Sequence, residues 1–270
     1  MKITFIGGGN MAVALIGGLR RQGYSAAAIQ VVEPIAEARE KLTESLGVRC
    51  AASVDAAALA CEILVLAVKP QQMKDAVAPL VGKLGGQLVI SIAAGLRMAD
   101  ISRWLGNYKA LVRTMPNTPA LISSGVTALC ADPSVDREGR SNAEKVMRAV
   151  GSTIWVEDEA QMDAVTAVSG SGPAYVFYFL EAMEAAGLEL GFDAATARQL
   201  AVETFSGAAR LAEQSSESLS TLRTRVTSKG GTTEAALLAF DTAGVGEGIA
   251  RGIAAANTRG RELGEMLGKD

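Results

Sequence analysis

The stretch "KITFIGGGNMA", residues 2–12, decides how the first half of this chain folds. A β-rich apolar run ends at Gly7, and three glycines lead into a segment with helical periodicity. The spacing fits G-x-G-x-x-G/A, in which one glycine permits a tight turn, the next lets a pyrophosphate approach the backbone, and a small third residue packs helix on strand. A plain glycine-rich turn is the alternative. The predicted cofactor contacts here are Gly7, Gly8, Gly9, Asn10, Met11 and Ala12.

A second strand is predicted over residues 29–33, and Glu33 stands at its carboxyl end. An acidic residue roughly 20 residues beyond such a glycine turn accepts hydrogen bonds from a ribose 2′-hydroxyl. A carboxylate there would repel a 2′-phosphate, so Glu33 favours NADH over NADPH. The alternative is a solvated residue that precedes Pro34.

Two further strands, over residues 62–68 and 87–93, are near-continuous apolar runs, as strands buried on both faces require. The first ends in "AVKP", at the sheet edge where open α/β folds bind ligands. Lys69 is therefore predicted to lie near the cofactor, and a surface lysine at a strand end is the alternative. The predicted contacts from this segment are Ala67, Val68, Lys69 and Pro70, with Pro70 opening the next helix.

Residues 115–120, "MPNTPA", form another element at a strand end. Two prolines stiffen it, and Asn117 offers both a donor and an acceptor to a carboxamide such as that of nicotinamide. Asn117 is thus a predicted cofactor contact, with a plain proline turn as the alternative.

Strand and helix patterns alternate up to about Glu159, which predicts a parallel, doubly wound sheet with right-handed crossovers. The later strands are expected at 109–116, 125–130 and 152–157, and helices at 36–47 and 137–151. Beyond Glu159 only helical patterns follow, at 173–186, 194–213, 218–225, 233–241 and 246–266. We predict a Rossmann-like α/β domain over residues 1–159 and an all-α domain over residues 160–270.

The helix predicted at 173–186 is apolar nearly all round, with aromatic residues clustered at 175–179. A helix of this kind needs partners on every side, and the short helical domain offers few. We therefore expect a second subunit to bury part of this surface, which makes the all-α domain a dimerisation domain. Burial against the chain's own sheet domain is the alternative.

Composition excludes several classes of protein. A net charge of −3 without a long basic run argues against a nucleic-acid partner. The chain has no histidine, which removes imidazole catalysis and His-ligated metals, so we expect no metal. The three cysteines form neither a CxxC pair nor an even set, so structural disulfides are not expected, and a reducing, cytoplasmic setting fits. The first 19 residues are expected to fold as strand, turn and helix rather than serve as a signal peptide, and no segment is expected to span a membrane.

Residues 226–237, "VTSKGGTTEAAL", place two glycines and several hydroxyl side chains before a helix. Glycine backbone N–H groups, hydroxyls and the positive end of a helix dipole together suit a small anion such as a carboxylate. A solvated helix cap is the alternative. The predicted substrate-binding residues are Ser228, Gly230, Gly231, Thr232 and Thr233.

Five motifs in order make this chain resemble the Δ1-pyrroline-5-carboxylate reductase family: "IGGGNMA" (6–12), "AVKP" (67–70), "MPNTPA" (115–120), "SGSGPAY" (169–175) and "VTSKGGTTEAAL" (226–237). The resemblance implies a Rossmann domain, a helical domain that interlocks into homodimers, and often larger rings of dimers. It implies hydride transfer from NADPH or NADH to C5 of the cyclic imine, which gives L-proline in the final step of proline biosynthesis.

By the same resemblance Thr233 is the catalytic candidate, reaching the imine nitrogen, and Ser169 and Ser171 are candidates for polar contacts in the cleft. Lys229 departs from the family, which usually has proline there; it removes stiffness and adds a positive charge. Glu33 is a second departure, because many members favour NADPH.

Two rival functions remain open at this point. One is another enzyme of the same architecture, a β-hydroxyacid or imine reductase. Hydroxyacid enzymes of this layout need a lysine in the interdomain helix, and this chain has none between Lys145 and Lys229. A non-catalytic nucleotide-binding protein would be expected to have lost the donors of the 226–237 segment, and all of them are present.

Overall fold

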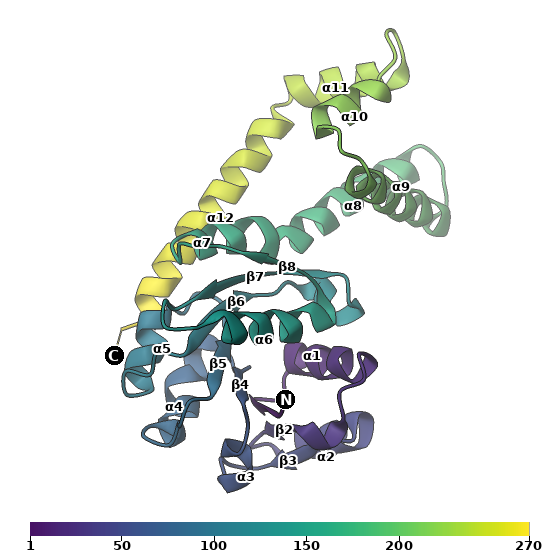
Figure 1. The fold of residues 1–270 in the computed structure, drawn as a ribbon. Helices are drawn as coiled ribbons and strands as arrows, with labels where there is room; N and C mark the ends of the chain where they lie inside the picture. The colour runs from purple at the N-terminus through teal and green to yellow at the C-terminus, as the bar shows by residue number, and fades with distance from the viewer. Residues whose placement is uncertain (270) are drawn as a thin grey trace. The chain divides into compact units, whose positions relative to one another are not determined.

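Eight strands form a single sheet in the computed structural model, which describes residues 1–269. Their order across the sheet is β3-β2-β1-β4-β5-β6-β7-β8. The order turns back at β1 and β4, as it does in doubly wound folds. Figure 1 shows the chain as a ribbon coloured from its amino terminus to its carboxyl terminus. The strands are β1 Ile3–Ile6, β2 Ile29–Val32, β3 Arg49–Ala51, β4 Ile63–Leu66, β5 Leu88–Ser91, β6 Leu111–Met115, β7 Gly125–Ala131 and β8 Gly151–Trp155.

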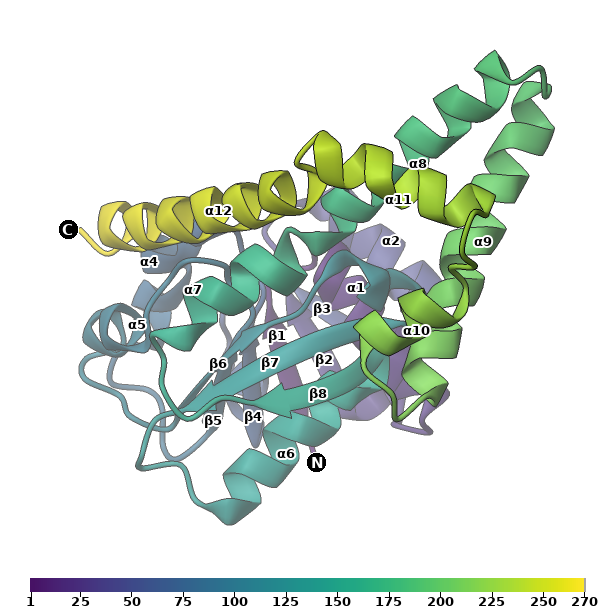
Figure 2. The ribbon, with the colours of Figure 1, turned by 90° about the horizontal axis from the view of Figure 1, so that it is seen from above.

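One pair of neighbours, β6 and β7, is antiparallel, and the other pairs are parallel. The expectation of an all-parallel sheet is therefore wrong at this pair. The connection holds only a short 3₁₀ helix, η4 (Thr118–Ile122), and a parallel crossover needs about a dozen residues or more. Figure 2 shows β6, β7 and β8 lying side by side.

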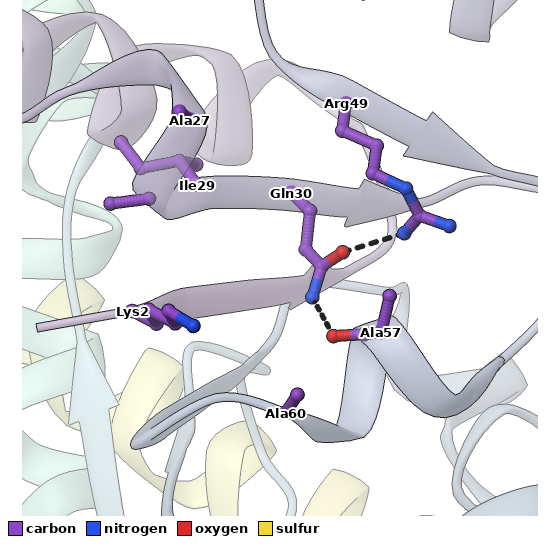
Figure 3. Close-up of a pocket in the computed structure, with 8 residues that line it drawn as sticks. Lys2, Ala27, Ile29, Gln30, Arg49, Ala57 and Ala60 are labelled. Carbon is purple, nitrogen blue, oxygen red and sulfur yellow. Dashed lines mark hydrogen bonds between the residues drawn. The ribbon is translucent and has the colours of Figure 1, made fainter.

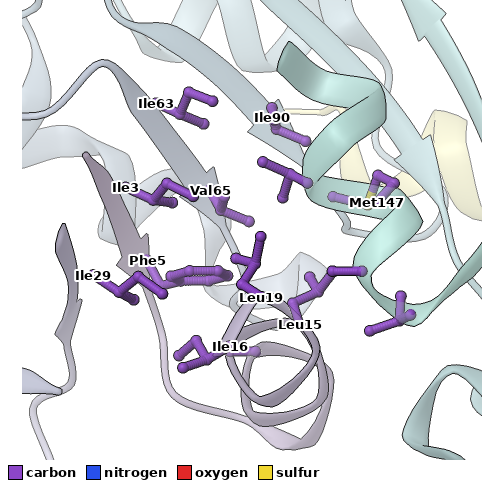
Figure 4. Close-up of a cluster of buried hydrophobic side chains, with 14 of the residues drawn as sticks. Ile3, Phe5, Leu15, Ile16, Leu19, Ile29, Ile63, Val65, Ile90 and Met147 are labelled. Carbon is purple, nitrogen blue, oxygen red and sulfur yellow. The ribbon is translucent and has the colours of Figure 1, made fainter. Parts of the chain in front are cut away.

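The core lies on both faces of the sheet because strand side chains alternate between them. Ile3 and Phe5 of β1 pack in one apolar cluster, whereas Ile6 packs in the other. The first cluster includes residues of α1 (Asn10–Arg21), α2 (Ala36–Leu46) and α6 (Arg137–Met147) (Figure 4). The second cluster includes residues of α3 (Ala56–Leu59), α4 (Met73–Val77) and α5 (Met98–Trp104). Helices on both faces confirm the doubly wound architecture.

Helix boundaries follow local chemistry. Helix α2 ends at Gly47, whose φ of +69° is a left-handed conformation that glycine adopts without strain. Pro70 opens the short 3₁₀ helix η2 (Pro70–Gln72) ahead of α4, as expected from its fixed φ. Strand β3 was not predicted, because it has three residues and no apolar run.

Beyond β8 the chain is helical, which confirms the all-α character of the carboxyl-terminal region. A π-helical turn, η6 (Thr166–Gly170), connects α7 to α8 and was not predicted. The α-helices are α7 Gln161–Val165, α8 Gly172–Glu189, α9 Ala194–Gln214, α10 Leu219–Arg225, α11 Thr232–Thr242 and α12 Val245–Leu267.

The chain divides into two compact units, and the division differs from the predicted boundary at 159/160. Unit 1 comprises Met1–Ser171 and the residues from Ala256 onward, and unit 2 comprises Gly172–Ala255. Met162 of α7 is fully buried beside β7, which keeps α7 with the sheet. The end of α12 also belongs to unit 1, where Arg103 donates to the Gly268 carbonyl at 2.7 Å. The domain limits themselves stay a prediction.

Unit 2 has little core of its own. Helix α8 packs on α9, where the rings of Phe179 and Phe205 lie 6.3 Å apart. None of the 18 residues of α8 is buried, and the buried residues of α9 are Ala197 and Ala201. A helix as apolar as α8 without a buried face requires a further partner surface.

Candidate functional site

A groove of about 630 Å³ runs along the carboxyl ends of β1, β2 and β4 in unit 1. Crevices at this edge, where strand order turns back, bind dinucleotides in open α/β sheets. The volume is within the range of ordinary ligand pockets. Its lining residues are Ile6, Gly7, Gly8, Gly9, Val32, Glu33, Pro34, Ile35, Ala52, Ser53, Val54, Ala67, Val68, Lys69, Gln72, Asp75, Ala76 and Pro79.

The glycine turn has the features that a pyrophosphate needs. Gly7 has φ +98°, and a side chain there would come within 2.7 Å of the Ala67 carbonyl oxygen. Gly9 precedes α1 as its N-cap, and a Cβ at Gly9 would meet nothing within 4 Å. The first N–H groups of a helix lack partners within it and face outward. Ala12 is fully buried, so the third small residue lets α1 pack on the strand. The turn therefore fits a dinucleotide phosphate.

Glu33 lines the groove, but its carboxylate is engaged with the main chain. Its Oε2 accepts the N–H of Gly8 at 3.0 Å, and its Oε1 accepts the N–H of Ile35 at 3.0 Å. Arg39 donates to the Glu33 carbonyl at 2.8 Å and to the Pro34 carbonyl at 2.8 Å. Glu33 is 9% exposed. The carboxylate thus both fixes the turn and places its negative charge at the end of β2.

Seven of the predicted cofactor contacts line this groove: Gly7, Gly8, Gly9, Glu33, Ala67, Val68 and Lys69. Asn10, Met11 and Ala12 continue from it as the first turn of α1, and Pro70 follows Lys69 at the start of η2. Sequence reasoning missed the apolar side of the groove, formed by Ile35, Val54, Ala76 and Pro79. Their signal was weak, because Ile35 and Val54 lie in loops and Ala76 and Pro79 lie in short helices without a motif.

Asn117 lies apart from this groove, at the carboxyl end of β6. Its Oδ1 accepts the N–H of Val126 at 3.0 Å. Its Nδ2 lies 3.3 Å from Ser169 Oγ and 3.4 Å from the Ser169 carbonyl oxygen. The structure therefore brings together two residues that the sequence had singled out separately.

The predicted substrate loop belongs to unit 2 and precedes α11. Gly230 has φ +71°, and Gly231 is the N-cap of α11 without a side-chain cap. The N–H of Gly230 donates to Glu234 Oε2 at 2.7 Å, and the N–H of Gly231 donates to the Ser228 carbonyl at 3.0 Å. Both predicted backbone donors of this loop therefore have acceptors within the chain, a side-chain carboxylate for Gly230 and a main-chain carbonyl for Gly231.

A second hollow, of about 210 Å³, lies at the opposite, amino-terminal edge of the sheet (Figure 3). Arg49 donates to Gln30 Oε1 at 2.6 Å, and the amide of Gln30 donates to the Ala57 carbonyl. Arg49 is also paired with Asp55. The hydrogen bond from Arg49, and then that from the Ala58 N–H, lower the pKa of Asp55 below its usual 3.8. These polar groups already have partners, so the hollow is a structural feature of the sheet edge.

A buried ion pair in unit 1 also escaped prediction. Arg113 of β6 is 3% exposed and lies 3.1 Å from Glu159 and 3.6 Å from Asp163. Glu159 additionally accepts the N–H of Met98 at 2.7 Å. This network ties β6 to α5 and α7, and its partners are too far apart in sequence to be recognised as a pair.

The described part of the chain has neither a metal-binding cluster nor a membrane-spanning helix. Among residues 1–269, no group of three or more Cys, Asp or Glu side chains is arranged to hold a metal ion. In the same part of the chain, no helix has the length and apolarity required to cross a membrane.

The fold and the groove define an NAD(P)-dependent oxidoreductase with a Rossmann-type nucleotide-binding region, and comparisons agree. Residues 2–95 match a family described as NADP oxidoreductase, coenzyme F420-dependent. Residues 159–263 match the pyrroline-5-carboxylate reductase dimerisation family.

Relatives extend this over nearly the whole chain, which belongs to the pyrroline-5-carboxylate reductase family. The enzyme of that name from Pseudomonas aeruginosa is 45% identical over 99% of this chain and 98% of its own length. That from Haemophilus influenzae is 43% identical over 97% of both chains. A solved pyrroline-5-carboxylate reductase from Coxiella burnetii matches with a TM-score of 0.92 at 40% identity, covering 97% of this chain and 98% of that one. One from Plasmodium falciparum with NADP bound matches with a TM-score of 0.86 at 25% identity, covering 98% of each.

Proposed function

We propose that this chain reduces L-1-pyrroline-5-carboxylate to L-proline, with NADPH or NADH as the electron donor, in the final step of proline biosynthesis. The observation that carries the proposal is 45% identity to a named pyrroline-5-carboxylate reductase across both the nucleotide-binding region and the helical region. The turn at Gly9, where a Cβ would meet nothing within 4 Å, supports it from the geometry.

The proposed cofactor contacts divide by chemical role. The N–H groups at the start of α1, from Gly9 to Met11, bind the pyrophosphate beside Gly7 and Gly8. Ala67, Val68 and Lys69 line the groove next to this turn, and Lys69 adds a positive charge; Pro70 follows them at the start of η2. Bound here, the reduced nicotinamide supplies the hydride. The protein's part is to hold it close to the imine carbon and exclude water.

Glu33 is proposed to favour NADH. Its carboxylate sits at the end of β2, where a ribose 2′-hydroxyl can donate to it and a 2′-phosphate is repelled. Two backbone N–H groups hold that negative charge in place. Replacement of a hydroxyl by a phosphate at this position is expected to cost on the order of 1–3 kcal/mol, in line with one well-placed polar contact.

The substrate carboxylate is proposed to bind at the start of α11, through the N–H groups of Gly230 and Gly231 and the hydroxyls of Ser228, Thr232 and Thr233. Glu234 must then release the Gly230 N–H, and the Ser228 carbonyl must release the Gly231 N–H, so that the incoming carboxylate replaces both acceptors. Lys229 is exposed beside this loop and adds a positive charge that favours the substrate. The positive end of the α11 dipole acts in the same direction.

The reaction adds a hydride to C5 and a proton to the ring nitrogen, so that the C=N bond becomes a C–N single bond. The chain has no histidine, and we propose that the Thr233 hydroxyl hydrogen-bonds to the ring nitrogen of the substrate. A threonine hydroxyl is a weak acid, so it passes on a proton from water or orients an imine that arrives protonated. The nitrogen gains basicity as the hydride reaches C5, which eases the proton step.

The assembly is proposed to be a homodimer formed through unit 2, with dimers joined into a larger ring. The dimerisation family match and the unburied apolar helix α8 support the dimer. Residues such as Phe177 and Tyr178, 65% and 75% exposed in the single chain, would then be covered by the partner.

The test is to mix purified protein with pyrroline-5-carboxylate and to follow reduced-nicotinamide absorbance with NADPH and NADH in parallel. Oxidation coupled to proline formation is expected with both, and faster with NADH at equal concentration. Folded protein that oxidises neither would disprove the proposal and shift attention to another cyclic imine or to a non-catalytic nucleotide binder.

A further inference from the structure

Both the oxygen and the NH₂ group of the Asn117 side chain are hydrogen-bonded within unit 1. Its Oδ1 accepts the Val126 N–H at 3.0 Å, which fixes which end of the amide is oxygen. The NH₂ group must therefore face Ser169, where it lies 3.3 Å from Oγ and 3.4 Å from the carbonyl oxygen. Asn117 thus bridges β7 to the residue Ser169, which is 52 positions away in sequence.

Ser169 belongs to the π-helical turn η6, over Thr166–Gly170. The N–H of Ser171 donates to the Thr166 carbonyl at 2.8 Å, five residues back, which is the π pattern. π-helical turns are rare in proteins, and those that do occur are frequently found at functional sites. The chain passes into unit 2 directly after this turn, at Gly172.

A second contact fixes the same turn from the same strand end. A Cβ added to Gly170 would lie 2.5 Å from Met115 Cε, so the turn packs directly on the last residue of β6. Met115 and Asn117 therefore hold consecutive residues, Gly170 and Ser169. This happens at the carboxyl end of β6, the edge at which open α/β sheets bind their ligands.

We propose that Asn117 is a positioning residue for the reaction: its amide fixes the π turn and so holds Ser169 at the carboxyl end of β6. It acts through Ser169 rather than on the reacting atoms, and any contact of Asn117 with the cofactor comes from its main chain. The inference rests on the proposed function, since its effect on turnover is measured as imine reduction.

The experiment compares Asn117→Ala, Ser169→Ala and the double variant in the full-length protein. Asn142→Ala, which removes an amide from α6 outside the site, is the matched control. Asn117→Ala is expected to lower kcat for imine reduction by roughly tenfold to a hundredfold, since a small misplacement near the reacting centre has effects of that size. The dissociation constant of NADPH, read by fluorescence, is expected to change by less than about twofold.

The double variant is expected to have nearly the kcat of Asn117→Ala alone, because residues that act as one unit are not additive. Hydrogen exchange provides a readout that does not depend on activity. In Asn117→Ala without ligands, the peptide covering residues 162–172 is expected to exchange faster than in the wild type, whereas Asn142→Ala leaves it unchanged.

Met115→Ala removes the side chain that packs on Gly170 and is expected to speed exchange at 162–172 in the same way. If Asn117→Ala weakens NADPH binding as much as it lowers kcat/KM, with unchanged exchange at 162–172, Asn117 contacts the cofactor directly and the proposal is overturned. Additive losses in the double variant overturn it as well. A wild-type protein without imine reduction refutes the proposed function instead, and the exchange result still decides whether Asn117 fixes the turn.

Discussion

The Oε2 atom of Glu33 lies 3.0 Å from the main-chain nitrogen of Gly8, so the end of β2 is hydrogen-bonded to the glycine turn. The other carboxylate oxygen accepts the Ile35 N–H at the same distance. Glu33 therefore accepts hydrogen bonds that shape the turn, and we propose a second role, in which its charge meets the ribose of a bound nucleotide. Substitutions that remove one role at a time can measure each.

Glu33→Gln removes the charge and keeps one of the two acceptors: its oxygen can accept the Gly8 N–H, while the Ile35 N–H loses its acceptor. The ratio of kcat/KM for NADPH to that for NADH is expected to rise about tenfold, which corresponds to about 1.4 kcal/mol. Steady-state kinetics with both cofactors measures the ratio. Glu33→Ala also removes the acceptor, so it should weaken both cofactors in addition to shifting the ratio. An unchanged ratio in both variants would show that Glu33 does not affect the choice between NADPH and NADH.

Thr233→Ala is expected to lower kcat by about tenfold to a hundredfold, because it removes the hydroxyl that we propose as the partner of the imine nitrogen. The NADPH dissociation constant should stay within about twofold, and Thr233→Ser should restore most of the turnover. Thr242→Ala is the matched control on the same helix, since the Thr242 hydroxyl only donates to the Leu238 carbonyl at 2.8 Å. Normal turnover in Thr233→Ala would remove this residue from the mechanism.

Tyr178→Glu places a charge on the unburied aromatic surface of α8, where Tyr178 is 75% exposed in the single chain. If a second subunit covers this surface, desolvation of the new charge should shift the dimer towards monomer. Sedimentation velocity at several concentrations measures the shift. Ser141→Glu adds the same charge on α6 and should leave the dimer intact. A dimer of unchanged affinity in Tyr178→Glu would place the interface elsewhere.

Gly17 and Gly18 are adjacent residues of α1, and replacing each with alanine is expected to change the free energy of unfolding in opposite directions. A Cβ at Gly18 would lie 2.1 Å from the Ala149 carbonyl oxygen, so Gly18→Ala should reduce the free energy of unfolding by about 1–3 kcal/mol. At Gly17 the nearest atom is the end of Arg21, 3.5 Å away, and Gly17→Ala should increase it by about 0.5–1 kcal/mol. Urea unfolding of both variants checks the sign; equal effects would contradict the packing.

The lowered pKa of Asp55 predicts a pH-dependent contribution to stability. Because the folded state holds the carboxylate charged below its usual pKa of 3.8, the contribution is present above that pH. It is lost as the pH falls through the folded pKa. The difference in unfolding free energy between wild type and Asp55→Asn should therefore be largest at pH 6–7 and shrink below about pH 4. A difference independent of pH would show that the Arg49 pair contributes nothing through charge.

The sequence by itself determined the pattern of elements. The apolar runs placed seven of the eight strands, and the helical periodicity placed α8 to α12 within a few residues. The glycine spacing at 7–12 also placed the turn that borders the groove. These features are local, because the pattern of neighbouring residues is enough to predict a strand, a helix or a glycine turn.

Only the tertiary structure decided which residues meet. The direction of β7, the π turn at 166–170 and the pairing of Asn117 with Ser169 depend on how distant segments pack. The same holds for Arg113 with Glu159 and for the end of α12 beside α5. Each is a contact between residues far apart in the chain, made where packing brings their elements together, and a local pattern carries no signal for its partner.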